Sequence, residues 1–164
     1  RRRVALLRGV RVADMERIYA ERLRLNPGAP ELIAAAKAAG LKTLLVSGGF
    51  TFFAERVAAR LGMDYVRANV LEVEDGQLTG RMVDQPWGDI VDGAMKRDTL
   101  LATCAQLGCT GAQAIAVGDG ANDLPMMAAA GLSVAYHAKP IVRAQAHVAI
   151  DEGGLDRLLE VVRP

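Results

Sequence analysis

Short apolar segments alternate with amphipathic segments along most of this 164-residue sequence, and this alternation limits the fold more than any other feature. The apolar segments are bounded by glycines or polar turns, as buried parallel strands are, and the amphipathic segments have helical spacing. Alternating strands and helices predict an α/β fold, with a parallel sheet and helices on both of its faces. The predicted strands are 41–46, 112–117, 132–135 and 147–150, and the predicted helices are 30–39, 50–61, 93–107, 140–146 and 155–162.

Two segments depart from this alternation. An amphipathic helix is predicted over residues 10–23, before the chain breaker at residues 26–28. Residues 65–73 and 77–83 flank an Asp75-Gly76 turn and predict a β-hairpin. The length is that of one domain with a core of its own, and no internal repeat or linker interrupts it.

The charge balance excludes polyanions as partners. There are 20 Lys and Arg residues against 19 Asp and Glu, a formal net charge of +1, so no global field would hold nucleic acid or an anionic membrane. Every apolar run is too short to span a membrane, and the first residues do not resemble a signal peptide, so we expect a cytoplasmic protein. A homodimer is left open. Cys104 and Cys109 suit neither a disulfide framework nor a zinc site, and we expect them to be structural.

A candidate anion site follows the predicted strand at 41–46. Ser47, Gly48 and Gly49 supply a hydroxyl and unencumbered backbone N–H groups just before a predicted helix. The orphan donors and the helix dipole both favour a phosphate or carboxylate at such a position. A plain glycine-rich turn with Ser47 as the helix N-cap explains this tripeptide equally well.

The loop after the predicted strand at 112–117 is richer in oxygen ligands. It contains Asp119, Asn122 and Asp123, and Gly118 and Gly120 allow its backbone to fold closely. Carboxylates at the end of a strand suit Mg²⁺, which completes its octahedron with water and substrate oxygens. An Asx turn followed by a helix cap is the alternative, and it explains one aspartate but not the set.

Lys96 lies in the predicted helix 93–107, which leads into the same strand. Most lysines on helices are simply solvated. An ammonium group aimed at a phosphate beside Mg²⁺ would, however, neutralise the charge that develops in phosphoryl transfer. Lys96 is therefore a candidate phosphate-binding residue.

Three segments together resemble the haloacid dehalogenase-type phosphatases and, more narrowly, the phosphoserine phosphatase family. They correspond to the second, third and fourth motifs of that family, and the resemblance extends along nearly the whole chain. It implies a haloacid dehalogenase-like, Rossmann-type α/β fold with a small β-hairpin and part of a helical cap at the N-terminus. The segments are 44–50 (LLVSGGF), 88–92 (GDIVD) with Lys96, and 118–126 (GDGANDLPM).

The same resemblance implies a role for each candidate residue. Arg3 matches an arginine that pairs with the substrate's carboxylate, although an arginine in so basic a segment is as readily a surface residue. The resemblance implies that Ser47, the Gly48 backbone, Lys96 and Asn122 bind the transferring phosphate, and that Asp119 ligates Mg²⁺ with Asp123 supporting the metal site.

The family's first motif, Asp-x-Asp-x-Thr, has no counterpart here, because Asp-x-Asp does not occur in the sequence. In the family this motif supplies the nucleophile and the general acid/base, from a strand in the middle of the sheet. We expect residues 1–25 to be a remnant of the cap and residues 26–164 to be the core without its first strand. We hypothesise that these residues are the C-terminal part of a longer chain, and a continuous sheet would contradict this.

The resemblance thus implies a Mg²⁺-dependent phosphomonoester hydrolase that converts O-phosphoserine and water to serine and phosphate. The aspartyl-phosphate would form on a residue outside this chain, and the 164 residues alone should be inactive. Two alternatives stay open. One is a related phosphatase for another small phosphomonoester, and the other is a non-catalytic module that binds phosphate or Mg²⁺.

Overall fold

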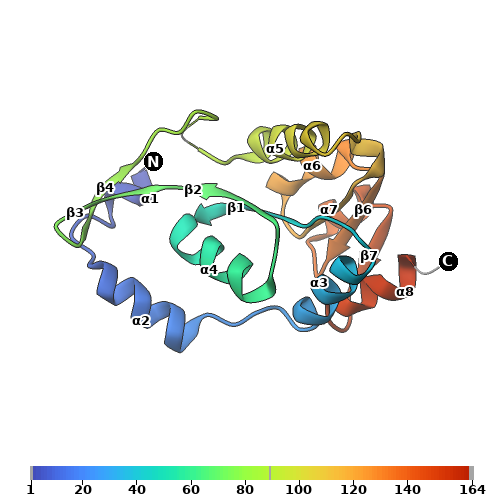
Figure 1. Cartoon of the computed structure of the whole chain (residues 1–164), viewed down its shortest axis with the longest axis horizontal. Helices are drawn as coiled ribbons and strands as arrows, with labels where there is room; N and C mark the ends of the chain where they lie inside the picture. Colours follow the sequence, from blue (N-terminus) through green and yellow to red (C-terminus); the bar gives the residue numbers. More distant parts are fainter. Residues whose placement is uncertain (1, 89, 163–164) are drawn as a thin grey trace. The chain divides into compact units, whose positions relative to one another are not determined.

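The computed structural model describes residues 2–88 and 90–162, apart from the side chains of Arg2 and Arg3 (Figure 1). The chain divides into two compact units, each formed by two separate stretches of sequence. The first unit comprises Arg1–Leu25 and Leu45–Val91, and the second comprises Asn26–Leu44 and Asp92–Pro164. The predicted division into residues 1–25 and 26–164 remains a prediction.

The second unit is built on a parallel sheet with the strand order β5-β6-β7. The alternation of strands and helices in the sequence therefore predicted this part correctly. Its strands are β5 (Ile115–Gly118), β6 (Leu132–Tyr136) and β7 (Val148–Ile150). Its helices are α3 (Ala29–Ala38), α5 (Gly93–Gln106), α6 (Leu124–Ala129), α7 (Pro140–Gln145) and α8 (Leu158–Val162).

Helices cover both faces of this sheet. Successive residues of a strand point to opposite faces, so the neighbours Val134 and Ala135 of β6 show what packs on each side. Ala135 on β6 belongs to a core cluster with Leu100 of α5 and Met127 of α6. Its neighbour Val134 is fully buried on the other face, in a cluster with Leu158 of α8. The sheet therefore has a packed core on each side, as parallel sheets require.

The first unit contains one two-stranded sheet and one β-hairpin. β1 pairs with β2, and α4 packs against β2 in the same unit (Figure 1). The helices are α1 (Arg2–Ala5), α2 (Val12–Arg22) and α4 (Thr51–Leu61), and the strands are β1 (Leu44–Phe50), β2 (Tyr65–Asn69), β3 (Leu71–Glu74) and β4 (Gln77–Met82).

The predicted hairpin is correct in position but too long in its first arm. β3 and β4 pair antiparallel around Asp75 and Gly76, with Glu74 opposite Gln77. Asp75 and Gly76 both have positive φ, at 51° and 74°, as a tight hairpin turn requires. Residues 65–69, which the sequence placed in the hairpin, instead form β2 beside β1. Period-2 alternation marks a strand but does not say which strand it pairs with.

The glycine-rich segment after the first predicted strand is a second correction. Ser47, Gly48 and Gly49 do not turn the chain; they continue β1, which runs on to Phe50. α4 begins directly after it at Thr51, so Ser47 is not its N-cap. Glycine tolerates extended backbone as readily as a turn, so composition alone could not distinguish the two.

Three helices end in the same way, each at a glycine in the left-handed conformation. Gly40 after α3, Gly62 after α4 and Gly108 after α5 have φ values of 78°, 76° and 77°. At each end the residue after the glycine donates its N–H to a carbonyl five positions earlier, which defines a Schellman motif. The sequence predicted the helix ends at Gly40 and Gly62, because a left-handed position strongly favours glycine.

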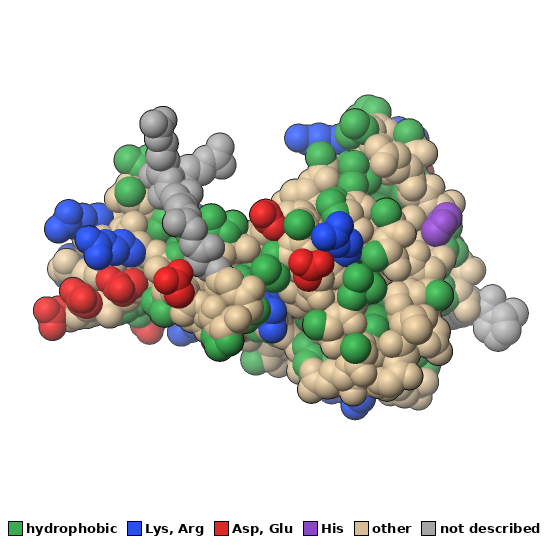
Figure 2. Space-filling view, turned by 90° about the horizontal axis from the view of Figure 1, so that it is seen from above, with side chains coloured by type: hydrophobic (Ala, Val, Ile, Leu, Met, Phe, Trp, Pro, Cys, Tyr) green, Lys and Arg blue, Asp and Glu red, His purple; other side chains and the backbone are tan. Residues whose placement is uncertain are grey.

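Within the described part of the chain, β6 is the only strand with two paired neighbours, and β5 and β1 each have one, β6 and β2 respectively. On the face shown in Figure 2, basic and acidic side chains are interspersed, in keeping with the net charge of +1. Among the described residues, no helix has both the length and the apolar character needed to cross a membrane.

Candidate active site

The loop at the end of β5 is held by the side chain of Asp123. Its Oδ2 accepts hydrogen bonds from the backbone N–H groups of Asp119, at 3.1 Å, and Gly120, at 3.3 Å. The loop closes so tightly that a Cβ on Gly118 would lie 2.5 Å from the Cβ of Asp123. Gly118 is thus required by this close approach rather than by an unusual backbone angle.

Lys96 completes this arrangement from α5. Its Nζ lies 2.7 Å from Oδ1 of Asp123, and both residues are buried, with 6% and 7% of their surface exposed. The start of α5 is fixed as well, because the Asp92 carboxylate accepts a hydrogen bond from the N–H of Met95. A buried ammonium is thereby fixed in position behind the β5 loop, and its charge is balanced by Asp123.

The Asp119 carboxylate is exposed and differs from that of Asp123 in its contacts. It makes no hydrogen bond or ion pair with the residues that the structure describes, and it stands at the carboxyl end of β5. A free carboxylate at that position fits one ligand of a hard divalent cation. The described residues contain no cluster of three His, Cys, Asp or Glu side chains, so a metal ion here would take its other ligands from elsewhere.

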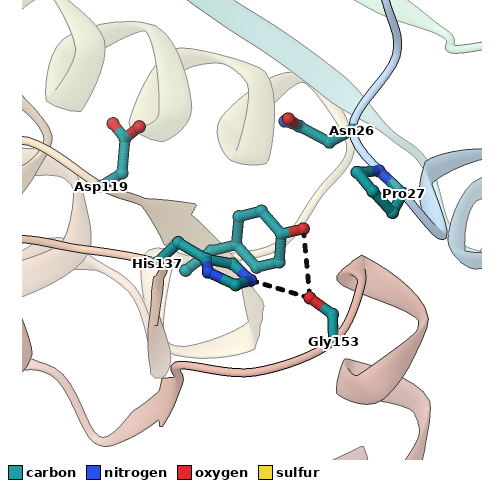
Figure 3. Close-up of a pocket in the computed structure, with 6 residues that line it drawn as sticks. Asn26, Pro27, Asp119, His137 and Gly153 are labelled. Carbon is teal, nitrogen blue, oxygen red and sulfur yellow. Dashed lines mark hydrogen bonds between the residues drawn. The ribbon is translucent and has the colours of Figure 1, made fainter.

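A cavity of about 340 Å³ opens beside Asp119 in the second unit (Figure 3). The Nε2–H of His137 donates to the carbonyl of Gly153 at 2.7 Å, and the rings of Tyr136 and His137 meet edge to face. Figure 3 shows the Asp119 carboxylate pointing away from these rings. Asn26 and Pro27 complete the lining.

In the first unit, Asn69 fixes the backbone of the Ser47–Gly49 segment. Asn69 is 6% exposed, and its amide donates to the carbonyl of Gly48 at 2.8 Å. Its amide oxygen accepts a hydrogen bond from the N–H of Val91 at 2.7 Å. Val91 precedes the start of α5 by two residues in the sequence. The Ser47 hydroxyl accepts from the N–H of Gly49 at 2.9 Å. This leaves the Ser47 hydroxyl hydrogen available to a ligand.

The predicted site residues therefore fall into two groups. Lys96, Asp119, Asn122 and Asp123 come together in the second unit, where Asn122 is exposed on the β5 loop. Ser47 and Gly48 belong to the first unit. The side chain of Arg3 lies outside the described residues, as does the whole of Asp89 in the third motif.

Sequence reasoning missed two positions in the site. Asn69 was treated only as part of a strand, although its side chain joins two segments that are 21 and 22 residues away. The sequence indicated no role for His137, which lines the cavity next to Asp119. The only local signal for Asn69 was a polar residue at the buried end of a strand, and for His137 there was none.

Comparison with known proteins places this chain in a family. Residues 1–128 match the model of the haloacid dehalogenase-like hydrolases. The chain is 71% identical over 163 residues to a phosphoserine phosphatase from Polaromonas sp. (strain JS666), covering 99% of this chain and 69% of that protein.

Solved structures agree in fold. A probable phosphoserine phosphatase from Vibrio cholerae superimposes with a TM-score of 0.89 at 42% identity, over 96% of this chain and 47% of that one. A structure described as a phospho-aspartyl intermediate analogue of phosphoserine phosphatase matches with a TM-score of 0.89 at 34% identity, over 98% and 75%. The chain therefore belongs to the haloacid dehalogenase-like hydrolases and, within them, to the phosphoserine phosphatase family.

Proposed function

We propose that this chain supplies the phosphate-binding and metal-binding residues of a phosphoserine phosphatase, which hydrolyses O-phosphoserine to serine and phosphate. The observation that carries the proposal is the buried Lys96 ammonium, held 2.7 Å from Asp123 behind the free carboxylate of Asp119. Phosphoryl transfer depends mainly on positioning and charge neutralisation, and a fixed buried cation provides both. The 71% identical phosphoserine phosphatase supports the same substrate class.

The roles of the individual residues follow from their contacts. Lys96 has three N–H donors, and its bond to Asp123 leaves donors for a phosphate oxygen. Ser47 can donate its hydroxyl hydrogen, because that hydroxyl accepts from the Gly49 N–H. The resemblance to the family adds the backbone of Gly48 to this proposal. Asn122 is exposed on the β5 loop, within reach of a ligand placed there. Within the second unit, Lys96 and Asn122 would bind non-reacting oxygens of the phosphate.

Phosphatases of this family generally use a divalent metal ion, and we propose Mg²⁺ for this chain. Asp119 would be a direct ligand, because its carboxylate is exposed and has no partner among the described residues. Both oxygens of Asp123 are already engaged, so Asp123 would orient the loop rather than bind the ion. When bound, the cation would neutralise phosphate charge and orient the phosphoryl group.

The nucleophile is proposed to come from outside these 164 residues. The structural relative with a phospho-aspartyl intermediate analogue points to an aspartate, and this sequence contains no Asp-x-Asp. Without the nucleophile and the general acid/base, only electrostatic binding of phosphate remains. We therefore expect no turnover above background from these residues alone.

Substrate choice can be tested with Arg3→Ala. The test protein joins this chain to the part of the Polaromonas relative that this chain does not match. Phosphate release is measured with phosphoserine and with glycerol 3-phosphate. If Arg3 binds the serine carboxylate, the variant raises KM for phosphoserine and leaves KM for the carboxylate-free ester unchanged. Preference for glycerol 3-phosphate in the unmodified protein would instead favour another small phosphomonoester as the substrate.

A cytoplasmic location and a homodimer remain predictions.

A further inference from the structure

The C-terminal end of α5 brings the two cysteines together. The N–H of Cys109 donates to the carbonyl of Cys104 at 2.9 Å, and the N–H of Gly108 donates to that of Ala105 at 3.1 Å. With Gly108 at φ 77°, these bonds form a Schellman motif. In that motif the side chains at the positions of Cys104 and Cys109 commonly contact each other.

The corresponding positions at the other two Schellman ends carry apolar side chains. The same hydrogen bond links Leu41 to Ala36 after α3, and Met63 to Ala58 after α4. At the end of α5 both positions carry free thiols, and Cys109 packs against the core cluster that contains Cys104. The turn that usually holds a hydrophobic contact thus holds a pair of thiols.

The two thiols differ in exposure. Cys104 is 5% exposed in the core between α5 and α6, whereas Cys109 is half-buried. Burial, and then the neighbouring Cys109 thiol, raise the pKa of Cys104. Cys104 is therefore held as a neutral thiol, and Cys109 is the more accessible partner for an oxidant.

We propose that Cys104 and Cys109 form a reversible intramolecular disulfide, with Cys109 reacting first and a low-molecular-weight disulfide as the oxidant. The Cys109 thiolate attacks one sulfur of the oxidant, whose S–S bond breaks and releases one thiolate. Cys104 then loses its proton and attacks the Cys109 sulfur, which releases the second thiolate. Two protein thiols become one disulfide, and one small disulfide becomes two thiols.

The test uses glutathione disulfide as the probe and intact mass as the readout. The unmodified chain should lose two hydrogen atoms, retain no glutathione, run as a monomer on a non-reducing gel and recover both thiols in dithiothreitol. A stable mixed disulfide, a disulfide-linked dimer, or no reaction would each overturn the proposal.

Two single variants test the order of attack. In Cys104→Ala, Cys109 should accumulate one glutathionyl group, because its resolving thiol is gone. In Cys109→Ala, Cys104 should react roughly tenfold or more slowly than Cys109 does in the first variant, until urea exposes it. Similar rates in the two folded variants would contradict the assigned order. The unmodified chain decides the main claim even if one variant fails to fold.

Discussion

The ion pair between Lys96 and Asp123 is the residue-scale interaction on which the geometry of the β5 loop depends. Asp123→Asn would leave the Lys96 ammonium buried without its counter-charge. We expect the variant to lower the free energy of unfolding by about 3 to 5 kcal/mol, measured by urea denaturation. Asp119→Asn is the matched control: its carboxylate is exposed, and the change should stay within about 0.5 kcal/mol. Equal losses in the two variants would contradict a special role for the buried pair.

Asn69 makes a second residue-scale prediction. Asn69→Ala would remove the partners of the Gly48 carbonyl and the Val91 N–H at a buried position. An unsatisfied buried group costs about 1 to 3 kcal/mol, so we expect a loss in that range by urea denaturation. Asn122→Ala serves as the exposed control and should be nearly neutral. A neutral Asn69→Ala would show that the Gly48 segment is held by other contacts.

The raised pKa of Cys104 predicts a pH dependence of stability. The folded chain holds this thiol proton to higher pH than the unfolded chain does, because burial disfavours the thiolate. The free energy of unfolding should therefore fall as pH rises above about 8.5, the usual thiol pKa, and be unaffected by this group below it. Cys104→Ala should show a shallower alkaline decline when thermal unfolding is followed between neutral and alkaline pH. Parallel declines would contradict this assignment.

At the scale of the element, the glycines that end the helices act through backbone conformation alone. Gly40 has φ 78°, and a Cβ there would meet nothing within 4 Å. Gly40→Ala should therefore destabilise by about 1 kcal/mol through left-handed strain, and Gly40→Asn by less. Thermal unfolding of the two variants checks this order. A loss in Gly40→Asn as large as in Gly40→Ala would point to a steric cause instead.

The sequence predicted elements better than pairings. Helix ends at Gly40 and Gly62 follow from local backbone preference, and the strands of the second unit follow from apolar runs between turns. The pairing of β2 with β1, instead of with the hairpin, depends on contacts between distant segments. The extended path of residues 47–49 was equally inaccessible, because glycine suits both a turn and a strand.

At the scale of the whole molecule, the candidate site was predictable wherever its residues are neighbours in sequence. Asp119, Asn122 and Asp123 lie on one loop, and their spacing alone indicated a shared site. The bond from Lys96 to Asp123 spans 27 residues, and a pattern could only suggest it. His137 reaches the cavity through the arrangement of β6 and the loop at Gly153, which no local pattern encodes.

The central claim is that these residues form the binding part of a phosphoserine phosphatase and need an aspartate nucleophile from elsewhere. The most direct test is Mg²⁺-dependent phosphate release from phosphoserine, by the 164-residue chain alone and by the chain joined to the part of the Polaromonas relative that it does not match. We predict release only from the joined protein, and a loss of roughly a hundredfold or more in its Lys96→Met variant. Turnover by the chain alone, or full activity in a folded Lys96→Met variant, would contradict the claim.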